Sequence, residues 1–366
     1  MKVVLVARDI APSNAFKMVV AEFLGNSWLP SHTSVLVKGA ELFVGSGKPL
    51  KATEDEIAAA VKSADVVLVG ISSSAELAKE ELVACKVAKE ASVPYGLYAD
   101  TFGCAVNRNW FDHVRAEASF VFVLNGKEAE EARKVFSKAK VVASGNPTWD
   151  DFFYPKLTRE ESRAKLGIKD DEVFVLCPGG KSLAINIQHW GFVIEALDFM
   201  NGSEYAPRKW NVIFSRHPGD QSAPDAYAEL VKFSDIQAKV VAPDEMKTSD
   251  MIPGMDVMVS CCSTVEIEAV CQRKPVISYI PHTGLVRMRT TMGDKWEPVE
   301  QGVVISSTPG CTFDLADSID DLLTLDVWNN SFVRSKQEAL YPKPTEKGVA
   351  LRAIIGTLQE FAKGRK

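Results

Sequence analysis

The sequence predicts an α/β protein made of two doubly wound, Rossmann-like domains that face each other across a cleft. Short β-branched runs alternate with amphipathic segments over most of the 366 residues, and such a pattern is typical of parallel sheets covered by helices on both faces. The chain is also too long for one ordinary hydrophobic core. A Gly-Asn-Pro turn and an aromatic connector, GNPTWDDFFYP, divide the pattern near its middle.

The first half carries runs of valine, leucine, isoleucine and aromatic residues that predict strands. They are Val3–Ala7, Ser34–Val37, Val66–Ile71, Tyr95–Tyr98, Phe120–Leu124 and Val141–Ala143. Between them, Ala75–Ala91 and Lys127–Ala139 have helical spacing of apolar residues and are predicted helices. We expect the first domain to span residues 1–155.

The second half repeats this alternation, and its predicted helices include Gln188–Phe199 and Pro224–Phe233, the latter with proline in the first turn. Its predicted strands are Val173–Cys177, Asn211–Phe214, Val240–Val241, Val257–Ser260, Val276–Tyr279 and Val303–Ser306. We expect this second domain to span residues 156–335. Residues 336–366 form a C-terminal segment with a helix at Glu346–Lys363 and no strand after it.

Composition narrows the class of protein. A net charge of −6 and a pI near 5.6 argue against a protein that grips nucleic acid through phosphates, although a nucleotide remains possible as a small ligand. We see no secretory signal and no apolar run of about 20 residues that could span a bilayer. The seven cysteines suit reduced thiols in a cytoplasmic protein, and the Cys261-Cys262 pair lacks the spaced partners of a zinc site.

Three predicted strands of the second half are followed by residues with binding chemistry. After Val173–Cys177 come Gly179, Gly180, Lys181 and Ser182. The glycines would let backbone amides approach an anion, and the lysine adds a positive charge. A plain Gly-Gly turn would explain the same residues, because the P-loop pattern is not present.

The strand Asn211–Phe214 is followed by an Arg-His pair, Arg216 and His217, before a Pro-Gly-Asp turn. The pair offers a fixed cation and a group that titrates near neutral pH. A solvated turn with a packed histidine is the alternative interpretation.

The strand Val257–Ser260 leads into Ser263 and Thr264 at the start of a predicted helix. Ser263 and Glu266 fit a capping box, which is a structural role. Glu268 lies two positions further on, about 200° around the helix, and needs a different partner. A ribose diol would supply donors to Glu268, while the amides of Ser263 and Thr264 at the helix N-terminus suit a diphosphate.

The stretches GNPTWDD, VLCPGGKS, SRHPGD and CSTVEIEAVCQRKPVI resemble the C-terminal half of GT-B nucleotide-sugar enzymes over roughly Val141 to Tyr279. That group includes glycosyltransferases, the lipid A disaccharide synthase type, CDP-glycerol polymer transferases and UDP-N-acetylglucosamine 2-epimerases. The resemblance implies that Glu268 is the glutamate that hydrogen-bonds the nucleotide ribose. It also implies that the helix from Glu346 packs back toward the first domain.

The first half resembles this group less. The usual glycine-rich first loop is missing, and residues 8–14 (RDIAPSN) stand in its place. Asp9 and Asp100 follow predicted strands and could each take a proton from an acceptor hydroxyl. Asp100 precedes Thr-Phe-Gly, so an Asx-type turn is the structural alternative. Asp9, Asp100 and His217 are therefore the candidate catalytic residues.

The leading functional hypothesis is a glycosyltransferase that uses a nucleoside-diphosphate sugar, expected to be a UDP-sugar, and an unidentified acceptor. Lys181 and Arg216 would stabilise the leaving diphosphate. No Asp-x-Asp occurs in the chain, so no bound metal or tightly bound cofactor is expected. The alternatives are a UDP-N-acetylglucosamine 2-epimerase, a phosphotransferase that forms polymers from a CDP-activated alcohol, and a non-catalytic nucleotide-binding protein.

Overall fold

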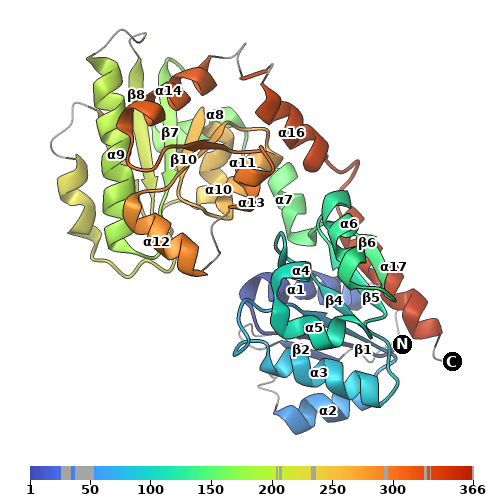
Figure 1. Cartoon of the computed structure of the whole chain (residues 1–366). Helices are drawn as coiled ribbons and strands as arrows, with labels where there is room; N and C mark the ends of the chain where they lie inside the picture. Colours follow the sequence, from blue (N-terminus) through green and yellow to red (C-terminus); the bar gives the residue numbers. More distant parts are fainter. Residues whose placement is uncertain are drawn as a thin grey trace. The chain divides into compact units, whose positions relative to one another are not determined.

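A computed structural model describes the chain except for residues 26–33, 38–52, 203–204, 206–207, 232–235, 292–295, 325–327, 330 and 365–366. The chain forms two compact units (Figure 1). Unit 1 comprises residues 1–150 and 344–366, and unit 2 comprises residues 151–343.

Unit 1 is built on a six-stranded parallel sheet of order β2-β1-β3-β4-β5-β6. The strands are β1 (Val3–Ala7), β2 (Ser34–Val37), β3 (Val66–Gly70), β4 (Tyr95–Tyr98), β5 (Phe120–Val123) and β6 (Lys140–Ala143). The α-helices are α1 (Ile10–Gly25), α2 (Glu54–Lys62), α3 (Lys79–Glu90), α4 (Cys104–Asn107), α5 (Asp112–Arg115), α6 (Gly126–Val135) and α17 (Val349–Lys363), and the 3₁₀ turns are η1 (Asn109–Phe111) and η2 (Pro147–Trp149).

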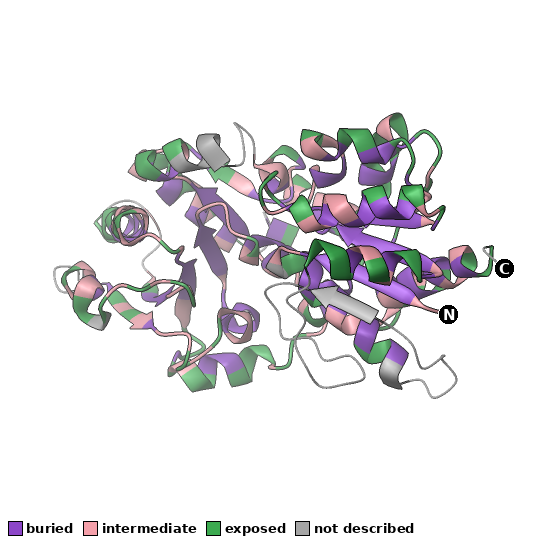
Figure 2. Cartoon of the chain, turned by 90° about the horizontal axis from the view of Figure 1, so that it is seen from below, coloured by how far each residue is buried: buried purple, intermediate pink, exposed green. Residues whose placement is uncertain are grey.

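Alternate residues of strands β1, β3, β4, β5 and β6 enter two separate cores, because successive side chains point to opposite faces of a sheet. Val4 and Val67 pack with helices α2, α3 and α6, whereas Leu5 and Leu68 pack with α1 and α17. In Figure 2 strands β1, β3, β4 and β5 of this sheet are buried, and the exposed residues lie mainly on the outer faces of the helices. The C-terminal helix α17 thus completes the covering of the unit 1 sheet.

Helix α1 was not predicted, since Pro12, Ser13 and Asn14 read as a loop. Proline is tolerated in a first helical turn, where its missing N–H has no intrahelical partner. The Ser13 hydroxyl also donates to the carbonyl oxygen of Asp9 at 2.6 Å. The segment that stands in place of a glycine-rich loop is therefore the start of a helix.

Unit 2 repeats the arrangement with a parallel sheet of order β12-β11-β10-β7-β8-β9. Its strands are β7 (Glu172–Pro178), β8 (Lys209–Ser215), β9 (Gln237–Val241), β10 (Val257–Ser260), β11 (Val276–Tyr279) and β12 (Ile305–Ser307). Its α-helices are α7 (Asp150–Phe153), α8 (Arg159–Leu166), α9 (Leu183–Asn201), α10 (Thr248–Met251), α11 (Val265–Cys271), α12 (His282–Thr291), α13 (Glu297–Glu300), α14 (Thr312–Leu323) and α16 (Phe332–Leu340), and its 3₁₀ segments are η3 (Pro224–Val231) and η4 (Ile252–Gly254).

All twelve predicted strands are present, with ends that differ by up to three residues. The α-helix predicted at Pro224–Phe233 is wrong in type, because residues Pro224–Val231 form a 3₁₀ helix, and its predicted end lies outside the described residues. Each sheet has a Rossmann-like order, in which the first strand of the unit lies inside the sheet and the chain proceeds outward in both directions. The α/β fold class is confirmed.

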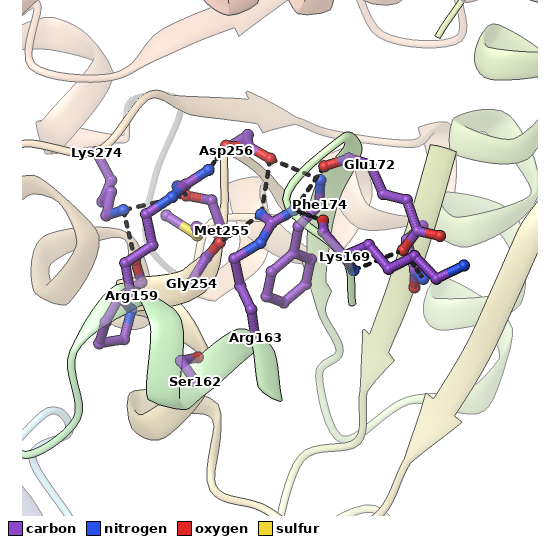
Figure 3. Close-up of polar contacts among 12 residues, drawn as sticks. Arg159, Ser162, Arg163, Lys169, Glu172, Phe174, Gly254, Met255, Asp256 and Lys274 are labelled. Atoms are coloured by element: carbon purple, nitrogen blue, oxygen red, sulfur yellow. Dashed lines mark hydrogen bonds and ion pairs between the residues drawn. The ribbon is translucent and has the colours of Figure 1, made fainter. Parts of the chain in front are cut away.

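A buried ionic cluster holds α8 against the edge of the unit 2 sheet where β7 and β10 begin (Figure 3). Arg163, with 1% of its surface exposed, donates to the carbonyl oxygens of Gly254 and Glu172 at 3.0 and 2.6 Å and pairs with Asp256 at 3.2 Å. Asp256 also accepts from the backbone N–H of Phe174 at 2.7 Å. This cluster lies at the end of the sheet opposite to the strand tips that carry the candidate site.

Candidate functional site

The candidate residues of unit 2 follow three neighbouring strands in the middle of the sheet. β7 lies between β10 and β8, so the segments that leave their carboxyl ends share one edge. The strand order reverses direction between β7 and β10, and open α/β sheets bind ligands at such a switch point. The chain topology therefore brings the residues predicted after the three strands to one edge of unit 2.

The two glycines after β7 are engaged within the protein. The N–H of Gly179 donates to the carbonyl of Ser215 at 2.8 Å, and the N–H of Gly180 donates to the side-chain oxygen of Asn186 at 2.7 Å. A side chain at position 179 would lie 2.8 Å from the Trp190 indole, so glycine is needed there for packing. Both amides thus bond to protein groups, unlike the anion-binding turn that the sequence suggested.

Lys181 follows these glycines and is exposed. Its Cε lies 3.2 Å from the place where a Cβ of Gly219 would stand, and the His217 ring lies at the same distance from that point. In the part of the chain that the structure describes, no carboxylate forms an ion pair with Lys181. The Lys181 side chain therefore lies beside the loop that follows β8, and none of the described carboxylates neutralises its positive charge through an ion pair.

Arg216 is committed to its own loop. Its guanidinium donates to Asp220 Oδ2 at 3.2 Å and to the carbonyl oxygen of Ser222 at 2.7 Å. The Asp220 carboxylate also accepts from the Tyr227 hydroxyl at 2.7 Å. Burial alone would raise the pKa of Asp220, but hydrogen bonds from Ser222, Tyr227 and Arg216 together lower it to about 2. The ionised aspartate holds Arg216, which was expected to face the diphosphate.

Two residues that sequence reasoning missed connect the loops after β7 and β8. The side-chain amide of Asn186 donates to the Gly180 carbonyl at 3.0 Å and to the Tyr227 hydroxyl at 2.9 Å. A chain of hydrogen bonds thus runs from Gly180 through Asn186 and Tyr227 to Asp220. No local sequence pattern predicts these hydrogen bonds, because Asn186 lies on α9 and Tyr227 lies on η3, far apart in the sequence.

The backbone N–H of Gly219 donates to Nδ1 of His217 at 2.8 Å. An accepting Nδ1 places the proton of the neutral ring on Nε2. Protonation of Nδ1 would break this bond. In the neutral form, His217 can therefore offer an Nε2 donor at the rim of the strand edge.

The loop between β10 and α11 contains Ser263 and Thr264, as expected from the strand and helix bounds. The residue before them, Cys262, has a φ of +48°, a left-handed conformation that costs energy in a non-glycine residue. Only half of the predicted capping box forms. Glu266 accepts from the Ser263 N–H at 3.3 Å, while the Ser263 hydroxyl lies 3.5 Å from the N–H of Val265 and does not bond to Glu266.

Glu268 is partly buried on α11. Its carboxylate accepts no hydrogen bond and forms no ion pair among the residues that the structure describes. Desolvation, with smaller contributions from the negative charges of Asp250 and Asp151, raises its pKa to about 7. A desolvated carboxylate without a hydrogen-bond donor, close to other negative charges, is destabilised. A ligand hydroxyl that donates a hydrogen bond to it would lower that free-energy cost.

The raised pKa of Glu268 predicts a dependence of stability on pH. The folded protein holds a proton on this group more tightly than the unfolded chain, whose glutamates titrate near pH 4.5, so the destabilisation it causes grows as pH rises from 4.5 to about 7. We therefore expect Glu268→Gln to raise the melting temperature at pH 8 and to change it little at pH 4.5. Equal shifts at both pH values would contradict the burial of this carboxylate.

In unit 1, Asp9 and Asp100 follow β1 and β4, which both neighbour β3. Asp9 accepts from the Ser73 N–H at 2.7 Å. Asp100 is 8% exposed, and its Oδ1 is buried with no hydrogen-bond partner in the described structure. Burial raises the pKa of Asp100 to about 6, against the opposing effect of the Arg108 charge, and Asp9 adds a smaller increase. Asp100 thus has the properties of a base that works near neutral pH.

Sequence reasoning missed Glu81, a fully buried carboxylate on α3. It accepts from the Arg8 N–H at 3.0 Å and from the Ser72 N–H and hydroxyl at 3.0 and 2.8 Å. Burial raises its pKa to about 8 despite these hydrogen bonds. A side chain at Gly70 would lie 3.0 Å from Oε1 of Glu81. The glycine at the end of β3 was therefore a sequence signal that another group packs closely there.

The described residues contain no group of three or more histidine, cysteine, aspartate or glutamate side chains that could hold a metal ion. Likewise, among the helices whose placement is described, none has the length and apolarity that crossing a bilayer requires.

Solved structures share this fold. UDP-GlcNAc 2-epimerase from Neisseria meningitidis, bound to UDP-GlcNAc, matches with a TM-score of 0.59 at 15% identity over 98% of this chain and 100% of the epimerase. A glycosyltransferase from Rickettsia africae ESF-5 matches with a TM-score of 0.62 at 13% identity over 99% of this chain and 98% of that one. The protein has the GT-B fold.

Another GT-B neighbour is the wall teichoic acid polymerase TagF, with a TM-score of 0.56 at 11% identity over 100% of this chain and 90% of the TagF chain. No protein-family profile and no curated protein sequence matches the chain. The predicted resemblance to GT-B nucleotide-sugar enzymes is confirmed at the level of the fold. Because the neighbours carry out different reactions, the GT-B fold alone does not select one.

Proposed function

We propose that the protein binds a nucleoside-diphosphate sugar, with the nucleotide on unit 2, and transfers the sugar to a hydroxyl of an acceptor. The observation that carries this proposal is the Glu268 carboxylate, which is partly buried and lacks a hydrogen-bond donor among the described residues. A ribose diol has two hydroxyl donors, and hydrogen bonds to a charged acceptor are among the stronger ones in proteins.

The diphosphate would lie near Lys181 and the backbone amide of Thr264, because the N–H of Ser263 already donates to Glu266. The lysine supplies a point charge, and an amide at a helix start suits an anion. Arg216 then acts by holding the loop after β8 in place, since Asp220 already neutralises its charge. His217 could donate from Nε2 to a phosphate or sugar oxygen. These charges would stabilise the diphosphate as it leaves.

In this proposal Asp100 of unit 1 takes the proton from the acceptor hydroxyl as the new glycosidic bond forms and the nucleoside diphosphate departs. Asp9 raises the pKa of Asp100 and is the second candidate base. No metal is expected to be needed, so activity should persist in a chelator of divalent cations. Loss of activity that added Mg²⁺ or Mn²⁺ restores would contradict this part of the mechanism.

The affinity for UDP tests the nucleotide site. Glu268→Gln should weaken UDP binding by about tenfold or more, because it removes the charge from an acceptor of ribose hydroxyls. Calorimetry of the wild type and the variant would measure this change. Glu160→Gln, an exposed glutamate on α8 of the same unit, is the matched control and should bind UDP as the wild type does. Equal affinities in all three proteins would remove the ribose assignment.

The second candidate function is 2-epimerisation of UDP-N-acetylglucosamine. The Neisseria enzyme acts on this sugar nucleotide, and its match to this protein extends over nearly the whole length of each chain. The nucleotide site proposed above would therefore suit an epimerase as well. Incubation with UDP-N-acetylglucosamine alone separates the two reactions, because an epimerase needs no acceptor. We expect proton NMR to show no 2-epimer, and its appearance would establish epimerisation instead.

A melting-temperature screen identifies the nucleotide. A ligand that binds only the folded protein raises its melting temperature according to concentration and affinity. We expect UDP and UDP-sugars to give larger shifts than CDP, ADP or GDP. A larger shift with CDP would favour the phosphotransferase alternative. Stabilisation by UDP without turnover of any sugar nucleotide would favour a binding protein without catalysis.

A further inference from the structure

We propose that Glu266 is a positioning residue for the β10–α11 loop (residues 261–264) and that its bond to Trp296 couples the start of α13 to nucleotide binding. The coupling to a nucleotide rests on the function proposed above. The positioning of the loop does not, because it follows from contacts within unit 2.

The Glu266 carboxylate joins three parts of unit 2. Its Oε1 accepts from the N–H of Ser263 at 3.3 Å and from the hydroxyl of Ser278 on β11 at 3.2 Å. Its Oε2 accepts from the indole N–H of Trp296 at 2.6 Å. Trp296 directly precedes α13, and its carbonyl accepts the N–H groups of Val299 and Glu300. One side chain thus fixes the loop, a neighbouring strand and a helix start.

A helix cap does not require this arrangement. The chain has complete capping boxes at α2 and α8, which use Glu56 and Glu161. Both of those glutamates are exposed and reach back to the cap residue, whereas Glu266 is 0% exposed. Burying a carboxylate costs several kcal/mol, and the cost is offset only when the hydrogen bonds are well placed. The burial of Glu266 indicates a role beyond capping.

The loop also contains a strained residue that must be held by its surroundings. Cys262 has a φ of +48°, and strained non-glycine residues persist only where neighbouring contacts determine them. The next residue, Ser263, gives its N–H to Glu266. Cys262 is the titratable group beside Glu266, and burial together with the Glu266 charge raises the pKa of its thiol. The thiol therefore stays protonated. Burial also raises the pKa of Glu266 itself to about 7, against the hydrogen bonds from Trp296 and Ser263, so this carboxylate is ionised above pH 7.

The test uses Glu266→Gln, Trp296→Phe and the double variant in the full chain. At pH 8, where Glu266 is ionised, each single change removes the charged bond between carboxylate and indole, so each should weaken UDP binding about fivefold. The double variant should bind no worse than the weaker single one, because both changes remove the same interaction. Glu161→Gln, which removes a carboxylate cap from α8, should leave the UDP affinity unchanged.

A spectroscopic readout distinguishes coupling from a loss of stability. In protein labelled with ¹⁵N-tryptophan, the signal lost in Trp296→Phe identifies the Trp296 indole N–H. That signal should shift when UDP is added to the wild type and should lie upfield in Glu266→Gln, where the bond to a charged acceptor is lost. An indole signal that ignores UDP, or UDP affinities that fall independently in the two single variants, would overturn the coupling.

Hydrogen exchange tests the positioning even if the wild type binds no nucleotide. Glu266→Gln should speed exchange of the amides of residues 262–265 relative to Glu161→Gln, because the loop loses its anchor. If Glu266→Gln does not fold, Trp296→Phe serves the same comparison. Unchanged protection of these amides in a folded variant would overturn the positioning role, whereas absent UDP binding with faster exchange would overturn only the proposed function.

Discussion

Asp100→Asn is expected to lower the turnover of a sugar nucleotide by about 10²–10⁴-fold, the usual contribution of a general base. Asparagine keeps the shape of the side chain but cannot take a proton. The substrate for this measurement is the sugar nucleotide that raises the melting temperature most, with release of its nucleoside diphosphate as the assay. UDP affinity should stay unchanged, because Asp100 belongs to unit 1 and the nucleotide is assigned to unit 2.

The pH profile makes the Asp100 prediction specific. Because the pKa of Asp100 is about 6, the wild-type rate should fall as pH drops below 6 and the base becomes protonated. The residual rate of Asp100→Asn should lack this dependence. Asp55→Asn, an exposed carboxylate on α2, is the control and should keep the wild-type rate and profile. If the turnover rate of Asp100→Asn lies within threefold of the wild-type rate, Asp100 is not the general base. The base would then be Asp9 or a residue other than these two aspartates.

Arg163→Met should destabilise unit 2 by about 3–5 kcal/mol, the cost of removing one partner from a buried ion pair. Methionine fills similar volume, but the carbonyl oxygens of Gly254 and Glu172 and one oxygen of Asp256 would each lose the guanidinium as a donor. Urea unfolding followed by tryptophan fluorescence would measure the loss, because Trp190, Trp210 and Trp328 lie in the core of unit 2.

Arg159→Met is the matched control for the buried pair. Arg159 bonds to the same Asp256 at 2.6 Å, yet 43% of its side chain is exposed. Exposed ion pairs contribute about 0–1 kcal/mol, so the control should unfold near the wild-type urea concentration. Similar losses in the two variants would show that burial does not set the energy of this cluster.

The fold could be predicted from the sequence because strand tips and hydrophobic periods are local features. The runs that became β7, β8 and β10 each end in small or polar residues, and parallel strands place such ends at one edge. The resemblance around CSTVEIEAV added the assignment of Glu268, which remains a proposal. Helix α1 was hidden because Pro12 and Asn14 imitate a loop.

The partners of the candidate residues could not be predicted, because they depend on contacts between distant segments. Arg216 was predicted to bind a ligand as a cation, but its guanidinium donates hydrogen bonds to Asp220 and to the carbonyl oxygen of Ser222. Glu266 was predicted only as part of a helix cap, but it is buried and also binds the indole of Trp296, 30 positions away. Such pairings follow from tertiary packing, which leaves no local pattern in the chain.

The central claim is that Glu268 receives the ribose of a nucleotide on unit 2. A crystal structure of the protein with UDP tests it most directly. We expect both ribose hydroxyls within hydrogen-bond distance of the Glu268 carboxylate, with the diphosphate near Lys181 and the N–H group of Thr264. Density for UDP elsewhere, with Glu268 remote from the ribose, would contradict the account.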